Sequence, residues 1–568
     1  MTRRTMICAA ILAAAAAQPA FARNDDCEGN ESLRLVNGRI HTMDERDSVV
    51  NSVLIKGGRF SAVGPHGMND GDRCTRSVNL RGRTVVPGII DNHNHIVLLG
   101  LRPGHDARLE NASSIAEALA TLTARADGVP AGEWITSIGG FSRNQFFPDP
   151  LPTRFPSLEE LSSAVPDHPV FIMESFSGPG ATNEKGRDFF VANGVTVGAD
   201  GSIAAGLASQ SALFLLRQMQ TLETQKRGLQ DAMTYAAGIG VTTHLDQGGF
   251  PALGDASDGA AHFHKYRAYD SLRGLLRERK LTNRIWINFL HLEEDPATPE
   301  LQARLDNAFN EFGDDMTRVL GIGEFTAGPF IGFPGTPQWM NATRRVAEAG
   351  WRNENHSLNF FNDWVQIIDG WQAVHDDLVT DGNPDGITKL RWVLAHVPVI
   401  TPEYIQKLKD LGGGISVLGG WRWLTGTATQ NGPPFRDILA SGIPVGMSSD
   451  GMQISTMSPW INLYYVVTGK NARGVPINAA QTLNRKDAIR LYTASNGWFL
   501  NAEDKLGTIE VGKLADLVVL SADYFSPAAV PDAAIKDLRS VLTIVNGKIV
   551  YDDRDGSRRD YWKAGLPQ

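Results

Sequence analysis

The sequence predicts an α/β protein: a TIM-like (β/α)8 barrel with a composite β-sandwich domain formed by both termini. Between about residues 84 and 500, short apolar segments typical of strands alternate with amphipathic stretches typical of helices. This alternation is the pattern of a parallel barrel. Residues 33–83 and 501–552 are instead rich in strand-like segments and tight turns, and two such ends can combine into one sandwich.

Length and composition are those of a globular protein with more than one core. The chain has 568 residues, so a large domain and at least one smaller domain are expected. Hydrophobic residues make up 42% and charged residues 21%, which is ordinary for such proteins. The formal net charge of -9 argues against nucleic acid as a partner. We therefore expect a small-molecule substrate, and the sequence leaves a homodimer open.

Residues 1–22 are predicted to be a secretory signal peptide. Arg3 and Arg4 precede the apolar run Met6–Ala17, and Ala20-Phe21-Ala22 fits a small-x-small cleavage site. The run is too short for a stable membrane span, so none is expected after removal of the signal. The arginine pair also resembles a twin-arginine signal, and the export route stays open. The mature protein is expected to be periplasmic or secreted.

Two cysteines, Cys27 and Cys74, remain after Cys8 leaves with the signal. They could pair in an oxidising compartment, and two unpaired thiols are an equally compatible interpretation. Neither cysteine lies near a cluster of metal-ligating residues, so a thiolate zinc site is not expected.

The predicted sandwich contains segments typical of β-hairpins. Leu33–Ile40 includes Asn37-Gly38, a dipeptide favoured in two-residue hairpin turns. Val53–Phe60 repeats the pattern around two glycines, and Val541–Tyr551 does so around Asn-Gly near the other end of the chain. Between the sandwich segments, the span from His95 to Glu324 is long for the few βα units it should hold. We therefore expect an inserted subdomain at about residues 134–207 that roofs the pocket.

Two histidines end the apolar segment Val85–His95. Side chains alternate between the faces of a strand, so His93 and His95 point the same way. Buried polar groups without partners cost roughly 1–3 kcal/mol each, which favours a metal-ligand pair over two incidental histidines.

This segment, Val85-Val86-Pro87-Gly88-Ile89-Ile90-Asp91-Asn92-His93-Asn94-His95, resembles the first barrel strand of the amidohydrolase superfamily, and more narrowly its family 3, or YtcJ-like, branch. The segment Gly507–Leu520, with Glu-x-Gly-Lys-x-Ala-Asp-Leu-Val-Val-Leu, resembles a second landmark of that family. The resemblance covers about residues 33–552. It implies a metal-dependent hydrolase whose barrel lies beside a sandwich.

Glu324 ends the predicted strand Val319–Phe325, where the family usually has a lysine that is carboxylated and bridges two metals. This chain has no lysine between Lys280 and Lys389, so we expect Glu324 to take that place. A glutamate paired with a local arginine is the alternative.

Three further residues fall at positions that the resemblance assigns to metal ligands. His356 matches the fifth-strand histidine, although the family's His-x-x-Gly-Asp is here His-Ser-Leu-Asn-Phe. His396 ends the apolar strand Leu390–His396, and Asp450 stands in a Gly-Met-Ser-Ser-Asp segment that resembles the eighth-strand motif. Asp450 is also the expected proton acceptor. His244 is expected to be structural or to line the pocket.

The sequence therefore predicts an exported metal-dependent amidohydrolase that hydrolyses an amide or related C–N bond with metal-activated water. Zn²⁺, as one or two ions, is the expected metal. A lactonase, esterase or deaminase on the same site, or a non-catalytic binding or regulatory protein that kept the fold, are the alternatives. The predicted metal ligands are His93, His95, Glu324, His356, His396 and Asp450, with Asp450 as the catalytic residue.

Overall fold

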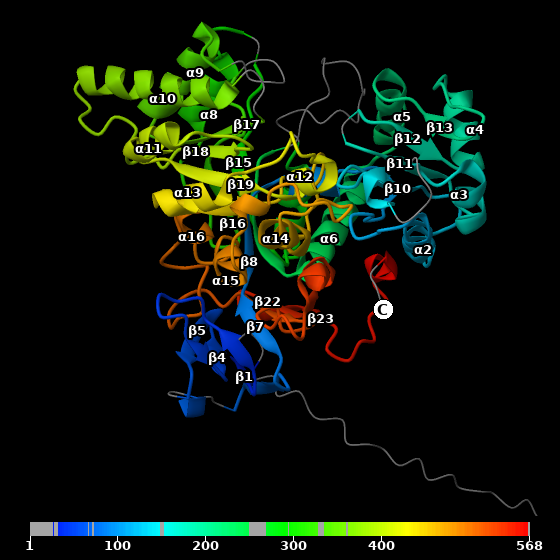
Figure 1. Cartoon of the computed structure of the whole chain (residues 1–568), viewed down its shortest axis with the longest axis horizontal. Coiled ribbons are helices and arrows are strands. Elements are labelled where there is room, and N and C mark those ends of the chain that lie inside the picture. The colour runs from blue at the N-terminus through cyan, green and yellow to red at the C-terminus, as the bar shows by residue number, and fades with distance from the viewer. Residues whose placement is uncertain are drawn as a thin grey trace, which may run out of the picture.

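The computed structural model describes residues 27, 32–65, 68–70, 73–147, 153–175, 177–248, 268–293, 295–327, 334–358 and 362–565 (Figure 1). The predicted signal peptide, residues 1–22, lies outside the described residues. Within the part of the chain that is described, no helix combines the length and apolarity needed to cross a membrane.

Eight parallel strands form the predicted barrel, and neighbours in the chain are neighbours in the sheet. The strands are β8 (Ile89–Asn94), β14 (Val241–Asp246), β15 (Arg284–Phe289), β16 (Thr317–Ile322), β17 (Arg352–Ser357), β18 (Val393–His396), β19 (Gly414–Leu418) and β20 (Val445–Ser448). The residues that follow β20 return to β8: Asp450 N donates to His93 O at 2.9 Å, and Ser449 N donates to Asp91 Oδ1 at 2.9 Å. The predicted α/β barrel is confirmed.

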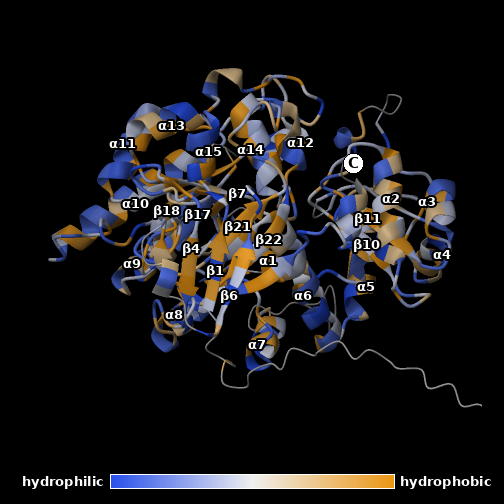
Figure 2. Cartoon of the chain, turned by 90° about the horizontal axis from the view of Figure 1, so that it is seen from below, coloured by the Kyte–Doolittle hydropathy of each residue, from blue (hydrophilic) through white to orange (hydrophobic). Residues whose placement is uncertain are grey.

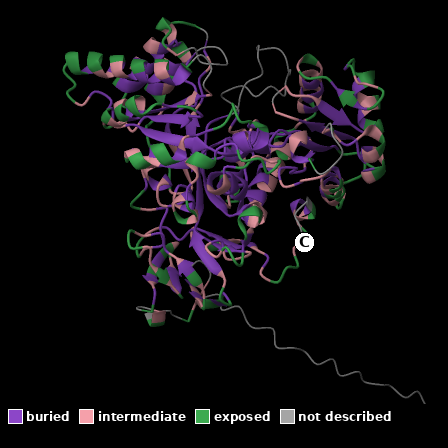
Figure 3. Ribbon diagram, viewed as in Figure 1, coloured by how far each residue is buried: buried purple, intermediate pink, exposed green. Residues whose placement is uncertain are grey.

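Helices separate the strands along the chain and cover the outside of the barrel. Figure 3 shows buried strands inside and helices whose outer faces are exposed. These helices are α6 (Leu222–Ile239), α7 (Asp270–Arg277), α8 (Pro299–Asn307), α9 (Pro337–Glu348), α10 (Asp363–Thr380), α11 (Pro402–Asp410), α13 (Phe435–Ser441) and α14 (Pro459–Thr468).

Two glycines position β8 and β14, the first pair of barrel strands. Gly240 ends α6 with a φ of 92°, a left-handed conformation that suits glycine, and β14 begins at the next residue. Gly88 precedes β8, and a Cβ at this position would lie 2.2 Å from Thr242 Oγ1. Only a glycine therefore lets the strand that carries the two histidines approach β14 this closely.

The sandwich is built from both ends of the chain, as predicted. One sheet has the order β5-β4-β1-β6, and the other has the order β23-β22-β21-β7-β2-β3. Its strands are β1 (Ser32–Val36), β2 (Arg39–His41), β3 (Val49–Val50), β4 (Val53–Lys56), β5 (Arg59–Val63), β6 (Thr75–Asn79), β7 (Thr84–Pro87), β21 (Leu517–Leu520), β22 (Ser540–Val545) and β23 (Lys548–Asp552). In Figure 1 the blue N-terminal strands lie beside the orange and red C-terminal ones, and Figure 2 shows their apolar character.

One of the expected hairpins is wrong. The turn at Asn37-Gly38 does not join two paired strands, because β1 pairs with β4 and β6, whereas β2 pairs with β3 and β7. The turn instead carries the chain from one sheet of the sandwich to the other. The hairpins β4–β5 and β22–β23 form as predicted, both antiparallel.

Two observed boundaries differ from those drawn from sequence. β7 lies in the six-stranded sheet, so the sandwich extends beyond residue 83. The inserted subdomain has its own sheet, ordered β13-β12-β11-β10-β9, and its first strand starts at residue 105 rather than near 134. The strands are β9 (His105–Asp106), β10 (Ile135–Ile138), β11 (Val170–Met173), β12 (Gly180–Thr182) and β13 (Ser202–Ile203), with helices α2 (Ile115–Ala126), α3 (Leu158–Ala164), α4 (Glu184–Ala192) and α5 (Leu207–Gln218).

The inserted subdomain contacts both the barrel and the C-terminal end of the chain. Gly140 N donates to Gln453 O at 3.2 Å, which joins the subdomain to the loop after β20. Tyr561 is buried, and the guanidinium of Arg125 on α2 lies 4.7 Å from the centre of its ring. At the other end of the chain, Cys27 and Cys74 form a disulfide, which resolves the alternative that the sequence left open.

Candidate metal centre

Six side chains converge where the barrel strands end. They form two groups in which the potential ligand atoms all lie within 4.8 Å of one another, and Glu324 belongs to both groups. The structure therefore brings together all six residues that the sequence predicted as metal ligands. The first group is His93, His95, Glu324 and Asp450, and the second is Glu324, His356 and His396.

The first group is arranged around the two histidines of the β8 segment. His95 Nε2 lies 3.2 Å from Asp450 Oδ1 and 3.4 Å from Glu324 Oε1. His93 Nε2 lies 3.3 Å from Glu324 Oε2 and 3.8 Å from Asp450 Oδ1. All four residues are buried, so two carboxylates and two imidazoles face one another away from solvent.

The two histidines of the second group both lie near Oε2 of the same glutamate. His356 Nδ1 lies 2.9 Å, and His396 Nε2 lies 3.3 Å, from Glu324 Oε2. Glu324 thus turns Oε1 toward His95, and Oε2 toward His356, His396 and also His93 of the first group. A carboxylate that lies within reach of both groups can serve as a bridging ligand.

The outer nitrogens of the β8 histidines are held by acceptors. His93 Nδ1 lies 2.6 Å from Glu354 Oε1, and His95 Nδ1 lies 2.8 Å from Gly248 O. Each imidazole therefore points its Nε2 into the centre, as metal-ligating histidines do when a carboxylate or carbonyl holds the other nitrogen. Among the described residues, the buried His93 Nε2 has no hydrogen-bond partner. This donor set fits a divalent cation.

The charges at the centre link protonation of the histidines to binding of a metal ion. Burial opposes protonation of His93, but the nearby carboxylates of Glu324 and Glu354 raise its pKa to about 10. Burial is likewise outweighed at His95, where Asp450 and Glu324 raise the pKa well above its usual value. Burial would raise the pKa of Glu324, but His356, His396 and His93 hold it well below its ordinary range. Without metal, protons on imidazoles balance the carboxylates, and a divalent cation would displace those protons.

Two residues of the centre have strained backbones. His396 has a φ of 72° and Asp450 a φ of 47°, in the left-handed region that residues with a Cβ rarely adopt. Such conformations cost about 1–3 kcal/mol each and persist where the surroundings enforce them, often at functional sites. The hydrogen bond from Asp450 N to His93 O, 2.9 Å, is one such constraint.

Glu354 is a functional residue that the sequence analysis missed. It is fully buried on β17, and its second oxygen accepts a hydrogen bond from Asn288 Nδ2 at 3.1 Å. A signal existed: Glu354 stands two residues before His356 on the same strand, so both side chains point into the barrel. It orients His93 by contacting Nδ1, the ring nitrogen that faces away from the metal centre.

His244 lies outside both groups of potential ligands. It is fully buried on β14, with Asn94 Nδ2 2.8 Å from its Nδ1 and Asn283 Nδ2 3.4 Å from its Nε2. Burial lowers its pKa to about 3, so it is neutral at physiological pH. These contacts give His244 a structural role in the barrel interior.

Sequence comparison relates this site to a known family. Residues 76–551 match the model of the amidohydrolase family. The chain belongs to the amidohydrolase family. The membership expected from the β8 motif is thereby confirmed, and with it the assignment of the protein as a metal-dependent hydrolase.

Individual relatives agree with this membership. The chain is 22% identical to an N-substituted formamide deformylase from Arthrobacter pascens, over 92% of this chain and 99% of that protein. An uncharacterized metal-dependent hydrolase from Pyrococcus horikoshii has a similar structure, with a TM-score of 0.58, 18% identity and coverage of 89% of this chain and 99% of that one. A mutant of atrazine chlorohydrolase from Arthrobacter aurescens, complexed with zinc and atraton, also has a similar structure. Its TM-score is 0.53, with 17% identity and coverage of 92% of this chain and 95% of that one. Both structural likenesses concern the fold.

Proposed function

We propose that this family member is an exported zinc hydrolase that cleaves an amide or related C–N bond of a small molecule. The observation that carries the proposal is the sharing of Glu324 between two groups of potential ligands. The chemistry named for the Arthrobacter pascens relative, deformylation of an N-substituted formamide, supports a C–N bond as the target.

With Glu324 shared, the other potential ligands divide between two metal ions. His93, His95 and Asp450 would hold the first ion, His356 and His396 the second, and Glu324 would bridge the two. Imidazole nitrogens and carboxylate oxygens suit Zn²⁺, and the zinc in the atrazine chlorohydrolase structure supports this choice. When bound, the metal would acidify water and polarise the carbonyl of the substrate.

Asp450 is the proposed acceptor of the proton that the attacking water loses. Burial would raise its pKa, but His396 and His95 lower it, so the carboxylate is ionised at neutral pH. Its oxygens lie 3.2 Å from His95 Nε2 and 3.9 Å from His396 Nε2, one histidine from each group. From there it can accept a proton and return it to the leaving nitrogen.

Export is proposed from the N-terminal sequence and the disulfide. The charged start, apolar run and Ala-Phe-Ala site are those of a signal peptide, and disulfides persist in oxidising compartments. The mature protein is then periplasmic or secreted and begins near Arg23. N-terminal sequencing of the native protein checks this, and a chain that still begins at Met1 would contradict it.

The decisive experiment measures metal content and hydrolysis together. Purified wild type should contain close to two zinc ions and hydrolyse members of a panel of N-substituted formamides and other amides. His93→Ala should lose metal and activity, whereas His41→Ala, a change in the sandwich where His41 stacks on Phe525, should keep both. The panel includes lactones, esters and amino-substituted heterocycles, because the same centre could attack each. If the enzyme turns over only lactones, esters or amino-substituted heterocycles, the assignment to amides is wrong. If His93→Ala keeps its full metal content and activity, the proposed metal site is wrong.

A further inference from the structure

The loop that follows Asp450, residues 451–458, decides where the carboxylate of that residue lies. Asp450 sits in a left-handed conformation, and the next residue, Gly451, accepts a hydrogen bond from His95 N at 2.8 Å through its carbonyl oxygen. The carboxylate approaches His95 only while this backbone keeps its course. Whatever holds the loop therefore contributes to the geometry of the metal centre.

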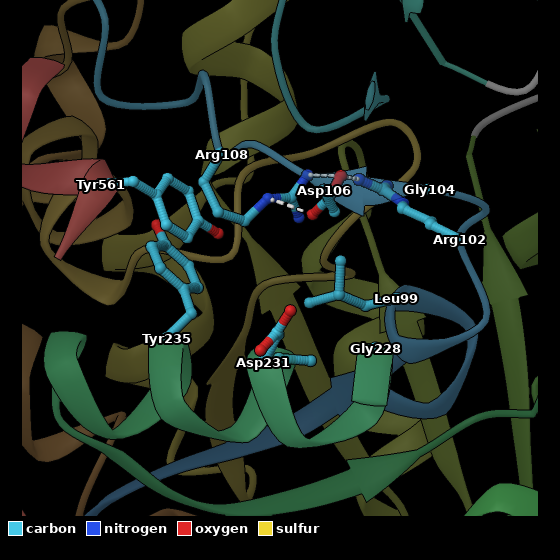
Figure 4. Close-up of a pocket in the computed structure, with 10 residues that line it drawn as sticks. Leu99, Arg102, Gly104, Asp106, Arg108, Gly228, Asp231, Tyr235 and Tyr561 are labelled. Carbon is cyan, nitrogen blue, oxygen red and sulfur yellow. Dashed lines mark hydrogen bonds and ion pairs between the residues drawn. The ribbon is translucent and has the colours of Figure 1, made fainter. Parts of the chain in front are cut away.

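Two arginines from the root of the inserted subdomain contact this loop. Arg102 Nη2 donates to Met452 O, and Arg108 Nη1 contacts Met452 Sδ. Their side chains are only 3% and 2% exposed. Both also contact one carboxylate: Asp106 Oδ2 lies 2.8 Å from Arg108 Nε, and Asp106 Oδ1 lies 3.5 Å from Arg102 Nη1. Figure 4 shows the two guanidiniums on either side of Asp106.

The far end of the loop is held by the same stretch of chain. Glu110 Oε2 accepts hydrogen bonds from Met457 N at 2.5 Å and Ser458 N at 3.4 Å, and its other oxygen contacts the hydroxyl of Tyr235. Residues 102–110 thus contact the loop near its start, at Met452, and near its end, at Met457. We call this stretch with its four charged side chains the brace; they are Arg102, Asp106, Arg108 and Glu110.

The charged side chains of the brace are buried, and removing charges from water costs free energy, so the brace is not explained by a gain in stability. Burial, together with the neighbouring charge of Arg108, lowers the pKa of Arg102 to about 9. Buried ion pairs often add little net stability compared with apolar residues of the same size. They do fix geometry, because guanidinium and carboxylate groups bind in directed ways.

We propose that Arg102 and Arg108 are positioning residues for Asp450, which act by holding Met452: Arg102 binds its carbonyl oxygen and Arg108 its sulfur. The inference rests on the proposed function, in which Asp450 binds metal and accepts a proton. The brace begins just after α1 (Ile96–Gly100) and includes β9, the first strand of the inserted subdomain. The subdomain therefore contributes to the metal centre without placing a ligand in it.

The test compares Arg102→Met and Arg108→Met with a matched control, Arg125→Met. Arg125 is also a largely buried arginine of this region, but it contacts Asp231 at 2.5 Å and the ring of Tyr561. A misplacement of about 1 Å near the reacting groups can cost about 10²-fold, so the two brace variants should lose up to that factor in kcat with little change in KM. Arg125→Met should lower the melting temperature and leave kcat within about twofold of wild type.

Two further measurements separate positioning from general damage. Zinc affinity, measured by competition with a chromophoric chelator, should fall in the brace variants and not in Arg125→Met. Hydrogen exchange on the metal-free protein should show faster exchange of backbone amides of the loop, residues 451–458, in Arg102→Met and Arg108→Met. Arg108→Lys, which keeps a charge, should recover part of kcat, and it serves as the milder change if Arg108→Met folds poorly.

The outcomes are distinct. Folded brace variants with wild-type kcat, zinc affinity and loop exchange would overturn the positioning role, as would losses that Arg125→Met shares equally. A wild type that binds no zinc and hydrolyses nothing would instead overturn the proposed function, and the positioning role would fall with it.

Discussion

Glu354 Oε1 lies 2.6 Å from Nδ1 of His93, and both side chains are fully buried in the barrel. The contact fixes which nitrogen of His93 faces the metal centre, and it raises the electron density of the ring when the other nitrogen binds a cation. The carboxylate has its own support in Asn288, so the orientation of His93 depends on three strands, β8, β15 and β17.

Replacing Glu354 with glutamine should weaken zinc binding about 10–100-fold, because an amide is a poorer acceptor for the imidazole N–H. Metal titration of the purified variant checks this. The matched control is Glu293→Gln: Glu293 is also a buried glutamate, but it accepts hydrogen bonds from Glu300 N and Leu301 N at the start of α8. The control should lose some thermal stability and keep its zinc. Equal zinc affinity in Glu354→Gln and wild type would contradict the role assigned to Glu354.

Replacing Glu324 with glutamine should remove one of two zinc ions and much of the rate, because a neutral amide bridges poorly and cannot offset the charge of a second cation. Activity of the wild type should not depend on bicarbonate, since Glu324 needs no carboxylation. Elemental analysis and assays with and without bicarbonate measure both effects. One zinc ion in the wild type, unchanged by the substitution, would mean a mononuclear centre in which Asp450 acts as proton acceptor rather than as a ligand shared by two ions.

Acid should destabilise the protein partly through His244. Burial lowers the pKa of His244 to about 3, below its usual 6.5, so the folded state resists protonation while the unfolded chain accepts a proton. The stabilisation from keeping this ring neutral is complete above pH 6.5 and is lost as pH falls toward 3. The melting temperature of His244→Asn, whatever its value at neutral pH, should therefore fall less steeply with acidification than that of wild type. Parallel curves over pH 6.5–4 would rule this contribution out.

Reduction of the Cys27–Cys74 disulfide should destabilise the sandwich more than the barrel. The residues lie 47 positions apart, and closing a loop of that length restricts the unfolded chain by up to about 4 kcal/mol. Calorimetry with and without reductant should show a lower melting temperature, and Cys27→Ser should reproduce the shift. Because the bond is remote from the metal centre, zinc content should not change; coincident loss of zinc would indicate that the sandwich and the centre unfold together.

Five of the six potential ligands could be predicted from the apolar strands that they end, because such ends gather at one mouth of a parallel barrel. His356 lies in the polar strand Arg352–Ser357, and only the family resemblance predicted it. Glu354 was missed, although it lies two residues before His356 and its side chain is therefore on the same face of the strand. Arg102 and Arg108 could not have been predicted, because Met452 is about 350 residues away and no local pattern announces the contact. The turn at Asn37-Gly38 shows a related limit: the dipeptide predicts a reversal of the chain but not which strands will pair.

The pairing of β7 with β21 ties the beginning of the fold to its end. During synthesis β7 is made when more than 400 residues are still to come, and until β21 emerges its edge has no partner on that side. A chain that terminates early, even one that has completed every barrel strand, leaves this edge open to other chains. The sheet closes on this side only once β21 has been made, so a chain truncated before Leu517 is expected to aggregate or be degraded rather than to act as a shortened enzyme.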